Sequence, residues 1–424
     1  EIYVSRLTFL ELTGKQIVFI LLSIFLVGVW FFLRRDMIGR PSTSWMSYYH
    51  AIDFLEATPR EILAFFKEMR SGIPPLLSLL EIVNVKVFGS TKIITNELYR
   101  LALLVSYCLA VWLFSKRIVN AVASFVLALI FLPATVFISA QNPEIYDVYF
   151  PCFVLMFLFF DQLTRECAKN RTLRVLSAFI SGLFLSFAEL SRPFVLVFIP
   201  IILMYIYLAY RPLPKKVLIA FLIPLLLISA SWHAKLLVFN NGQIFWSNHG
   251  GFNFYRAWGD IIDMPELVEE PQTWDNRSQI HTQEHYENGK RIQSAVLKYV
   301  LTHPLDSIPR IVERMGALLR PRLTLFDQPE PQDIFAWVYR IAFYAAFLFF
   351  LIQLMCLLID FIANPSLQLF ANPQHVLLIV IGASIAILAL AEKGEEARLL
   401  LAVLPLLAAL PQFEPVKTVA KPKS

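Results

Sequence analysis

The chain has 424 residues, of which 57% are apolar and only 16% are charged, and its mean hydropathy is +0.61. Soluble domains carry about 25% charged and 45–50% apolar residues, so this composition excludes a soluble enzyme and a disordered chain. The net charge is only +5, and the basic residues form no separate block, which excludes a nucleic-acid partner. Apolar runs of about 20 residues, in place of short alternating segments, indicate a polytopic α-helical membrane protein.

Apolar runs follow one another along the chain and predict an all-α bundle of about ten transmembrane helices, since about 20 helical residues cross the hydrocarbon layer. Two long polar segments, 34–96 and 235–335, interrupt them. We therefore expect an N-terminal transmembrane module at 1–234 that includes the loop 34–96, the large loop 235–335, C-terminal helices at 336–412 and a tail at 413–424. The predicted spans are 15–33, 97–115, 119–138, 146–163, 174–188, 193–210, 216–234, 336–359, 375–391 and 397–412.

Lys and Arg residues concentrate in alternate short loops, while the short loops between them hold only Arg192 and Lys393. Cytoplasmic loops are enriched in Lys and Arg, so the basic loops and both termini are predicted to be cytoplasmic, and the two long polar segments extracytoplasmic. We expect an integral protein of a bacterial inner membrane. Amphipathic stretches expected to lie in the interface plane occur at 45–55 and 60–69. The basic loop residues are Lys116, Arg117, Arg165, Lys169, Arg171, Arg174, Arg211, Lys215 and Lys216.

Ionisable residues inside a membrane are expensive and often functional, and here they gather at the predicted outer ends of the spans. Carboxylates from four separate loops would then meet on one surface above an apolar bundle. The alternative reading is that each is an ordinary helix-end residue, and the clustering carries more weight than any single member. The outer residues are Asp36, Asp53, Glu56, Glu144, Asp147, Glu189, Arg192, Glu392, Glu395, Glu396 and Arg398.

Short motifs occur in a fixed order along most of the chain. They are Gly72-Ile73-Pro74-Pro75-Leu76, Val87-Phe88-Gly89-Ser90, Tyr99-Arg100-Leu101, Asn142-Pro143-Glu144, Leu190-Ser191-Arg192-Pro193, Ser247-Asn248-His249-Gly250-Gly251-Phe252-Asn253-Phe254-Tyr255, His303-Pro304 followed by Arg310 and Arg314, and Glu395-Glu396-Ala397-Arg398 with Pro405. Together they resemble the C-type (GT-C) glycosyltransferases that use polyprenyl-phosphate sugars, a superfamily that includes the protein O-mannosyltransferases and the lipid A aminoarabinose transferases.

The resemblance implies a GT-C bundle with two long outer loops, and a hexosyl- or pentosyltransferase that inverts the sugar's configuration. The donor would be a polyprenyl-phosphate sugar, and the acceptor a hydroxyl of a glycan, lipid or protein at the outer face of the bilayer. We expect neither a cofactor nor a metal. The acceptor hydroxyl must lose a proton, which calls for a carboxylate within hydrogen-bond reach. The departing phosphate gains charge, which fixed cations and N–H donors stabilise, and the fork of an arginine matches phosphate geometry.

The catalytic base departs from the family pattern. The family places an acidic residue a few positions before a tyrosine, just after the first span, and here the spacing back from Tyr48 lands on Ser44. Three explanations stay open: a different register, Asp36 acting from closer to the membrane, or a base from elsewhere in the chain. Asp36 is the first candidate for the base and Asp53 the second.

The remaining site residues are assigned by the same resemblance. Glu144 or Asp147 would be a second carboxylate that orients the sugar or the acceptor. Gly250 and Gly251 would allow close backbone approach to a ligand, although the same glycines also suit a plain turn. The candidate substrate and phosphate contacts are His249, Gly250, Gly251, Arg256, Arg192 and Arg398, of which Arg192 could instead cap the interface and Arg398 could form a structural ion pair with Glu395 or Glu396.

Other classes of protein fit parts of the same pattern. A flippase or transporter of lipid-linked sugars also needs a lipid groove and outer-face charges, but it should carry polar groups at mid-span. A catalytically silent scaffold of the same family would explain the missing carboxylate near Ser44. His281-Thr282-Gln283-Glu284-His285 matches the H-x-x-E-H spacing of some zinc peptidases; a solvated helix is the preferred interpretation of this polar segment.

Overall fold

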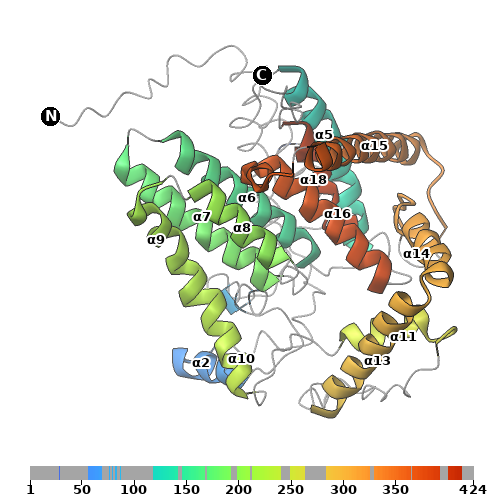
Figure 1. The fold of residues 1–424 in the computed structure, drawn as a ribbon, viewed down its shortest axis with the longest axis horizontal. Coiled ribbons are helices and arrows are strands. Elements are labelled where there is room, and N and C mark those ends of the chain that lie inside the picture. Colours follow the sequence, from blue (N-terminus) through green and yellow to red (C-terminus); the bar gives the residue numbers. More distant parts are fainter. Residues whose placement is uncertain are drawn as a thin grey trace.

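The protein is described by a computed structural model (Figure 1). The structure describes residues 28, 56–68, 76, 79, 82–83, 86, 118–141, 146–167, 170–191, 198–210, 213–239, 249–262, 283–324, 329–363, 365–391 and 400–412. Every regular element in these ranges is a helix, so the all-α prediction is confirmed for the described part of the chain. The first two predicted spans, 15–33 and 97–115, lie outside it apart from residue 28.

The helices follow the apolar runs of the sequence, with amphipathic helices between them. In chain order they are α2 (Pro59–Glu68), α5 (Ile118–Gln141), α6 (Tyr146–Glu166), α7 (Arg171–Ser191), α8 (Ile199–Tyr210), α9 (Lys215–Pro224), the π-helix η5 (Leu225–Ala230), α10 (Ser231–Phe239), α11 (His249–Trp258), α13 (Gln283–Thr302), α14 (Pro304–Leu318), α15 (Ile334–Ala363), the 3-10 helix η7 (Leu367–Ala371), α16 (Pro373–Ala391), α18 (Leu404–Ala409) and the 3-10 helix η8 (Leu410–Gln412).

Within the described residues, four helical segments are long and apolar enough to cross a membrane: Arg171–Ser191, Lys215–Val238, Ile334–Ala363 and Pro373–Leu390. They match four of the predicted spans, and they support a membrane protein. The second of them runs unbroken through α9, η5 and α10, so it ends beyond the predicted boundary at 234. Helices α5 and α8 carry shorter apolar stretches. The predicted count of about ten spans is not confirmed.

The last predicted span, 397–412, is wrong in its described part. Residues 401–403 form a turn, and the helix α18 that follows is only six residues long. Pro405 lies in its first turn, where the missing proline N–H is harmless, whereas a continuous helix through this position would lose a hydrogen bond. The segment is buried, and Ser124 of α5 donates a 2.6 Å hydrogen bond to the carbonyl of Ala408. It packs against α5, α6, α15 and α16 in the interior of the bundle and is not a lipid-facing helix.

Close packing of α6, α7 and α9 forms the centre of the bundle. The face of α7 toward its neighbours is rich in small side chains, among them Ala178, Ser181 and Gly182, which let membrane helices approach closely. A Cβ atom added to Gly182 would overlap the backbone carbonyl oxygen of Phe221 in α9. Glycine is therefore required where these two helices meet.

Of the two amphipathic stretches predicted to lie at the interface, 60–69 corresponds to α2, and 45–55 lies outside the described residues. Thr58 and Glu61 bond reciprocally at the start of α2: the Thr58 backbone N–H donates to Glu61 Oε2 over 2.6 Å, and the Glu61 N–H donates to Thr58 Oγ1 over 3.3 Å. This is a capping box. Hydrogen bonds from the backbone and the hydroxyl of Thr58 lower the pKa of Glu61.

The helix bundle has two chemically different ends. At one end, named the basic end, Arg165 donates to the carbonyl of Ala371 over 3.4 Å and Arg174 donates to the carbonyl of Thr164 over 3.1 Å. These bonds place loop 365–372 beside the basic loop between α6 and α7. Helices α11, α13 and α14 gather at the opposite end, beside the C-terminus of α16 (Figure 1). The orientation of these two ends relative to the cytoplasm stays a prediction.

Candidate functional site

A carboxylate and an imidazole meet between α7 and α10, near the opposite end. Glu189 follows the start of α7 at Arg171 by 18 residues, and His233 follows the start of α9 at Lys215 by 18 residues. At 1.5 Å of rise per residue, both lie about 27 Å from the basic end. This is close to the thickness of the hydrocarbon layer, about 30 Å. The pair thus lies at the depth where the far interface begins.

The two side chains of this pair lie within ion-pairing distance of each other. Glu189 Oε1 lies 3.1 Å from His233 Nε2, and the two side chains are 4% and 14% exposed. His233 Nδ1 lies 2.8 Å from the carbonyl oxygen of Ser229. Because a carbonyl only accepts, Nδ1 carries a hydrogen. Nε2 is then the nitrogen that can take up or release a proton, and the neutral imidazole beside the carboxylate can act as a general base.

The π-helical turn before His233 determines the direction in which its imidazole points. Pro224 precedes the π-helix η5 and has no N–H to donate to the turn before it. A π-turn adds one residue to a helix and is frequent at functional sites. Helix η5 packs against α7, so the inserted residue turns His233 toward Glu189. Both carboxylate oxygens of Glu189 are buried.

A second polar cluster covers the C-terminus of α16. Trp258 of α11 donates its indole N–H to the carbonyl of Leu390 over 2.9 Å, and Arg314 of α14 donates to the same carbonyl over 3.1 Å. The guanidinium of Arg314 lies 4.8 Å from the centre of the Trp258 ring. Cations and donors stabilise the partial negative charge at a helix C-terminus. The cluster therefore fixes α11 and α14 onto α16.

The same cluster holds a second arginine. Arg310 donates to the carbonyl of Ala257 over 2.9 Å and forms an ion pair with Asp260. Arg314 forms no ion pair within the described residues, and its buried Nη2 has no hydrogen-bond partner there. Burial and the nearby Arg310 lower the pKa of Arg314 to about 10, which still leaves the guanidinium protonated at neutral pH. A charged guanidinium thus lies beside the end of α16, with the carboxylates of Asp260 and Glu313 nearby.

A third cluster lies at the basic end and is closed on itself. Asp161 of α6 is fully buried, pairs with Arg165 one turn later and accepts a hydrogen bond from the hydroxyl of Tyr205 in α8. Arg165 also bonds to Tyr205. The charges compensate each other, so we interpret this cluster as a structural bond between α6 and α8.

Most of the residues predicted for catalysis are not among those that the structure describes. Asp36, Asp53 and Glu144 lie outside the described residues. Asp147 lies in the first turn of α6, and α6 runs from there to Arg165 at the basic end. Its backbone position is therefore at the opposite end, as predicted, while its catalytic role stays a prediction.

The residues predicted to contact the substrate are partly placed. His249, Gly250 and Gly251 form the first turn of α11, and Arg256 is exposed in its last turn. The glycines therefore begin a helix and do not form a plain turn. N–H groups without partners in a first helical turn favour anions. The other two predicted contacts, Arg192 and Arg398, lie outside the described residues.

Sequence reasoning missed the partner of Glu189. Glu189 was expected among the outer carboxylates but was not assigned a role, and His233 was not singled out. The available signal was that both are ionisable residues inside apolar helices, which is rare without a partner. Their distance along the chain, and the π-turn between them, concealed the pairing.

The H-x-x-E-H segment is only partly described by the structure. Helix α13 begins at Gln283, so His285 lies in its first turn and His281 lies outside the described residues. No group of three or more His, Cys, Asp or Glu side chains placed to hold a metal ion occurs in the described ranges. The predicted helix in this loop is present as α13.

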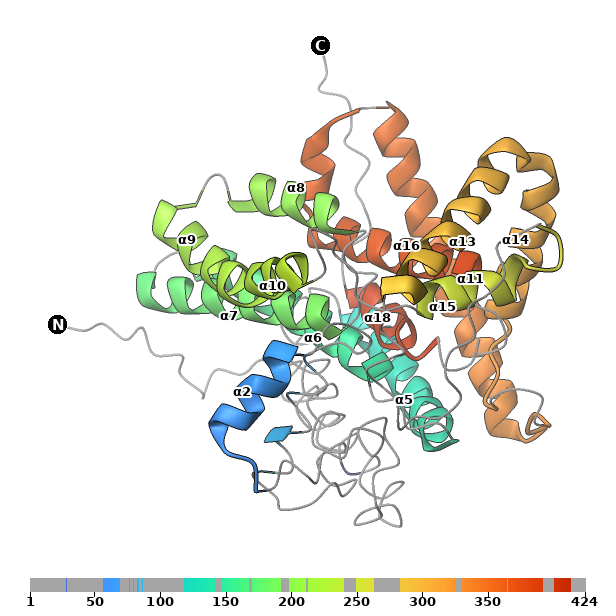
Figure 2. The same ribbon diagram turned by 90° about the horizontal axis from the view of Figure 1, so that it is seen from below.

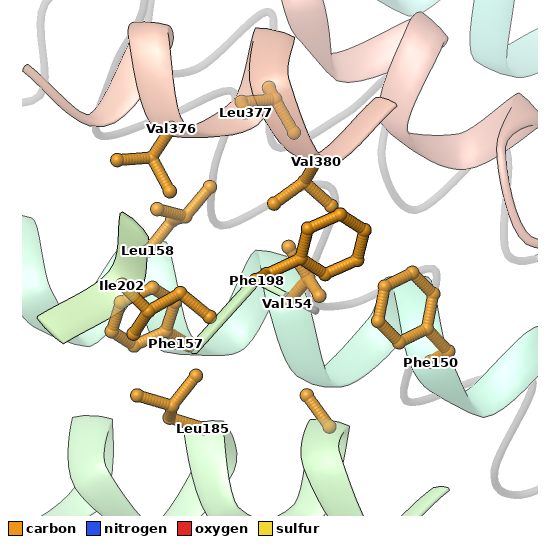
Figure 3. Close-up of a pocket in the computed structure, with 11 residues that line it drawn as sticks. Phe150, Val154, Phe157, Leu158, Leu185, Phe198, Ile202, Val376, Leu377 and Val380 are labelled. Atoms are coloured by element: carbon orange, nitrogen blue, oxygen red, sulfur yellow. The ribbon is translucent and has the colours of Figure 1, made fainter. Parts of the chain in front are cut away.

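An apolar cavity lies between α6, α7, α8 and α16 (Figure 3). Its volume is about 20 Å³, which is room for about one water-sized sphere. Leu185 and Ala188 of α7 line it together with side chains such as Phe150, Phe198 and Val380. A polyprenyl chain does not fit this space. This cavity therefore holds no lipid tail unless α8 or α16 is displaced.

Fold and site together define an all-α protein with four helices suited to crossing a membrane and with ionisable groups gathered at one end. No protein-family model, curated protein or solved structure matches the chain.

Proposed function

We propose that the chain is a membrane glycosyltransferase that moves a sugar from a polyprenyl-phosphate carrier to an acceptor hydroxyl at the extracytoplasmic face. The order of its short motifs, which resemble those of GT-C enzymes, supports the class of reaction. The observation that carries the proposal is the pair of Glu189 and His233 at the end of the bundle remote from the basic loops. A buried carboxylate with an imidazole partner is what abstraction of a hydroxyl proton requires.

In the proposed reaction, the acceptor oxygen attacks the anomeric carbon, and the bond between that carbon and the phosphate oxygen breaks. The bonding electrons leave with the phosphate, and the hydroxyl proton passes to the pair of Glu189 and His233. Attack from the side opposite the phosphate inverts the configuration. Asp36 and Asp53, the bases predicted from the sequence, are the alternatives to this pair. Each alternative predicts that substitution of a different residue abolishes sugar transfer.

The phosphate gains about one negative charge as it leaves, and preorganised donors lower the barrier most. The exposed guanidinium of Arg256, the first turn of α11 and the charge of Arg314 all lie on elements that pack at the same end. Their common location supports a phosphate site near α11.

The experiment uses the full chain in liposomes with a labelled polyprenyl-phosphate sugar and an envelope extract as acceptor, and measures release of free carrier phosphate. We expect Glu189→Gln to lower the rate at least about 10²-fold, the usual contribution of a general base. Glu166→Gln is the matched control, because Glu166 is exposed at the basic end and bonds only to Gln162 over 2.8 Å. Full activity of Glu189→Gln would remove this pair as the base, and carrier movement without sugar transfer would favour a flippase.

A further inference from the structure

Helices α13 and α14 expose a continuous row of apolar side chains, named here the apolar row. The spacing of three and four residues keeps the members on each helix on one side of that helix, and the chain bends between the two helices at His303 and Pro304. Leu301 and Leu305, on either side of the bend, are 79% and 82% exposed. The apolar row consists of Leu297, Leu301, Leu305, Ile308 and Val312.

The faces of α14 have three different environments. One face is buried toward the bundle and carries Arg314 and Leu318. A second face carries the exposed charges of Asp306 and Glu313. At 100° per residue, the apolar row lies roughly a third of a turn from each of the other two faces. Water suits the charged face and the bundle covers the buried one, so the apolar row needs a third, apolar neighbour.

The part of the chain that follows α14 supports a lipid neighbour. Helix α15 is one of the four membrane-crossing segments, and its first turns expose Ile334, Trp337 and Ile341. Trp337 lies under the guanidinium of Arg340, with 5.7 Å between ring centre and carbon, and tryptophan is typical of the membrane interface. Helix α14 also packs against α16, a second crossing segment (Figure 2). The helix that carries part of the apolar row thus packs against one membrane-crossing helix and precedes another in the chain.

Charge on α13 supports the same neighbour. Lys290, Arg291 and Lys298 are exposed on this helix. Basic residues beside an apolar helix face are attracted to anionic lipid headgroups. A second copy of the chain would need a complementary groove, whereas a fluid leaflet accepts a ridge along two helices.

We infer that α13 and α14 lie in the plane of the leaflet at the opposite end, with the apolar row about 5–10 Å deep in the boundary between headgroups and acyl chains. These two helices are then held to the lipid surface and do not extend freely into solvent. Arg314, on the neighbouring face of α14, is held at the level of the lipid phosphates. The inference concerns lipid contact alone and does not require the proposed transfer reaction.

The test places a fluorescent NBD label on the full chain in nanodiscs that contain phosphatidylglycerol. Leu305→Cys reports on the apolar row, and Glu313→Cys, exposed on the charged face of the same helix, is the matched control. Cys167→Ser removes the half-buried loop thiol from the background. We expect brominated lipids to quench the label at Leu305 at least threefold more than at Glu313, and aqueous iodide to show the reverse order.

Two results would overturn the inference. One is equal quenching by iodide at Leu305 and Glu313, which would place the row in water. The other is a label at Leu305 that both quenchers fail to reach, together with crosslinks between copies, which would show that a second chain covers the row. Leu301→Cys repeats the measurement on α13, so a folding defect of one variant does not decide the outcome.

Discussion

Replacement of Gly182 by alanine tests the closest contact in the bundle. The added Cβ would overlap the carbonyl oxygen of Phe221 and lie 3.0 Å from its carbonyl carbon. Both obstacles are backbone atoms, so no side-chain rotation relieves them, and α7 and α9 must separate by about 1 Å. A gap of this size forfeits a quarter to a half of each dispersion contact along the interface.

The magnitude follows from two opposing terms. Overpacking costs about 1–3 kcal/mol, and a clash with backbone belongs at the upper limit. Alanine offsets up to about 1 kcal/mol of this cost, because its backbone loses less conformational entropy on folding than that of glycine. We therefore expect Gly182→Ala to lower the free energy of unfolding by about 2 kcal/mol or more. Equilibrium unfolding in mixed SDS micelles measures this change.

Two other glycines provide matched controls. A Cβ on Gly316 in α14 meets nothing within 4 Å, and one on Gly382 in α16 meets the ring of Phe350 at an ordinary 3.5 Å. Both alanine variants should be unchanged or more stable by up to about 1 kcal/mol. If Gly182→Ala unfolds at the same SDS fraction as Gly316→Ala, the close approach of α7 and α9 is refuted.

Further predictions concern the polar clusters and the loop thiol. Asp161→Asn should destabilise the protein by about 3 kcal/mol, because it leaves a buried guanidinium without its carboxylate. Tyr205→Phe should cost only about 1 kcal/mol. Unfolding of both variants in SDS measures the two losses, and equal losses would contradict the ion-pair role. Trp258→Phe should cost about 1 kcal/mol through the lost bond to Leu390 and speed hydrogen exchange in 249–262; unchanged exchange would contradict it. Burial raises the pKa of the Cys167 thiol, so its maleimide reaction at pH 7 should be slower than that of a free thiol and keep rising at higher pH, as peptide mass spectrometry can measure.

Membrane-crossing helices could be predicted from the sequence because hydropathy and length are properties of a local segment. The predicted spans 174–188 and 375–391 agree within a few residues with the segments Arg171–Ser191 and Pro373–Leu390. The prediction of a span at 397–412 was wrong because the hydropathy of an apolar run is the same whether lipid or protein surrounds it. Only the packing of α18 against four other helices separates the two cases.

The candidate site was harder to predict, because it depends on rotation about helix axes. The apolar runs of α7 and of α9 to α10 predict that Glu189 and His233 lie at similar depths, but not that they face each other. Their 3.1 Å contact needs the π-turn after Pro224, and no hydropathy pattern reports such a turn. The amphipathic helix after His303 was predictable from its periodicity, whereas the bond between Arg314 and Leu390 joins segments far apart in the chain.

The π-helix η5 also makes the position of a deletion decisive. A π-turn holds one more residue than an α-turn, so losing one residue from Leu225–Ala230 would restore an ordinary α-helix. The residues after this deletion would keep their angle about the helix axis, and His233 would still point toward α7. Losing one residue from the first turns of α9 instead would rotate all later residues by about 100°. Frame-preserving deletion scanning should therefore find that the imidazole keeps its carboxylate in the first case and loses it in the second.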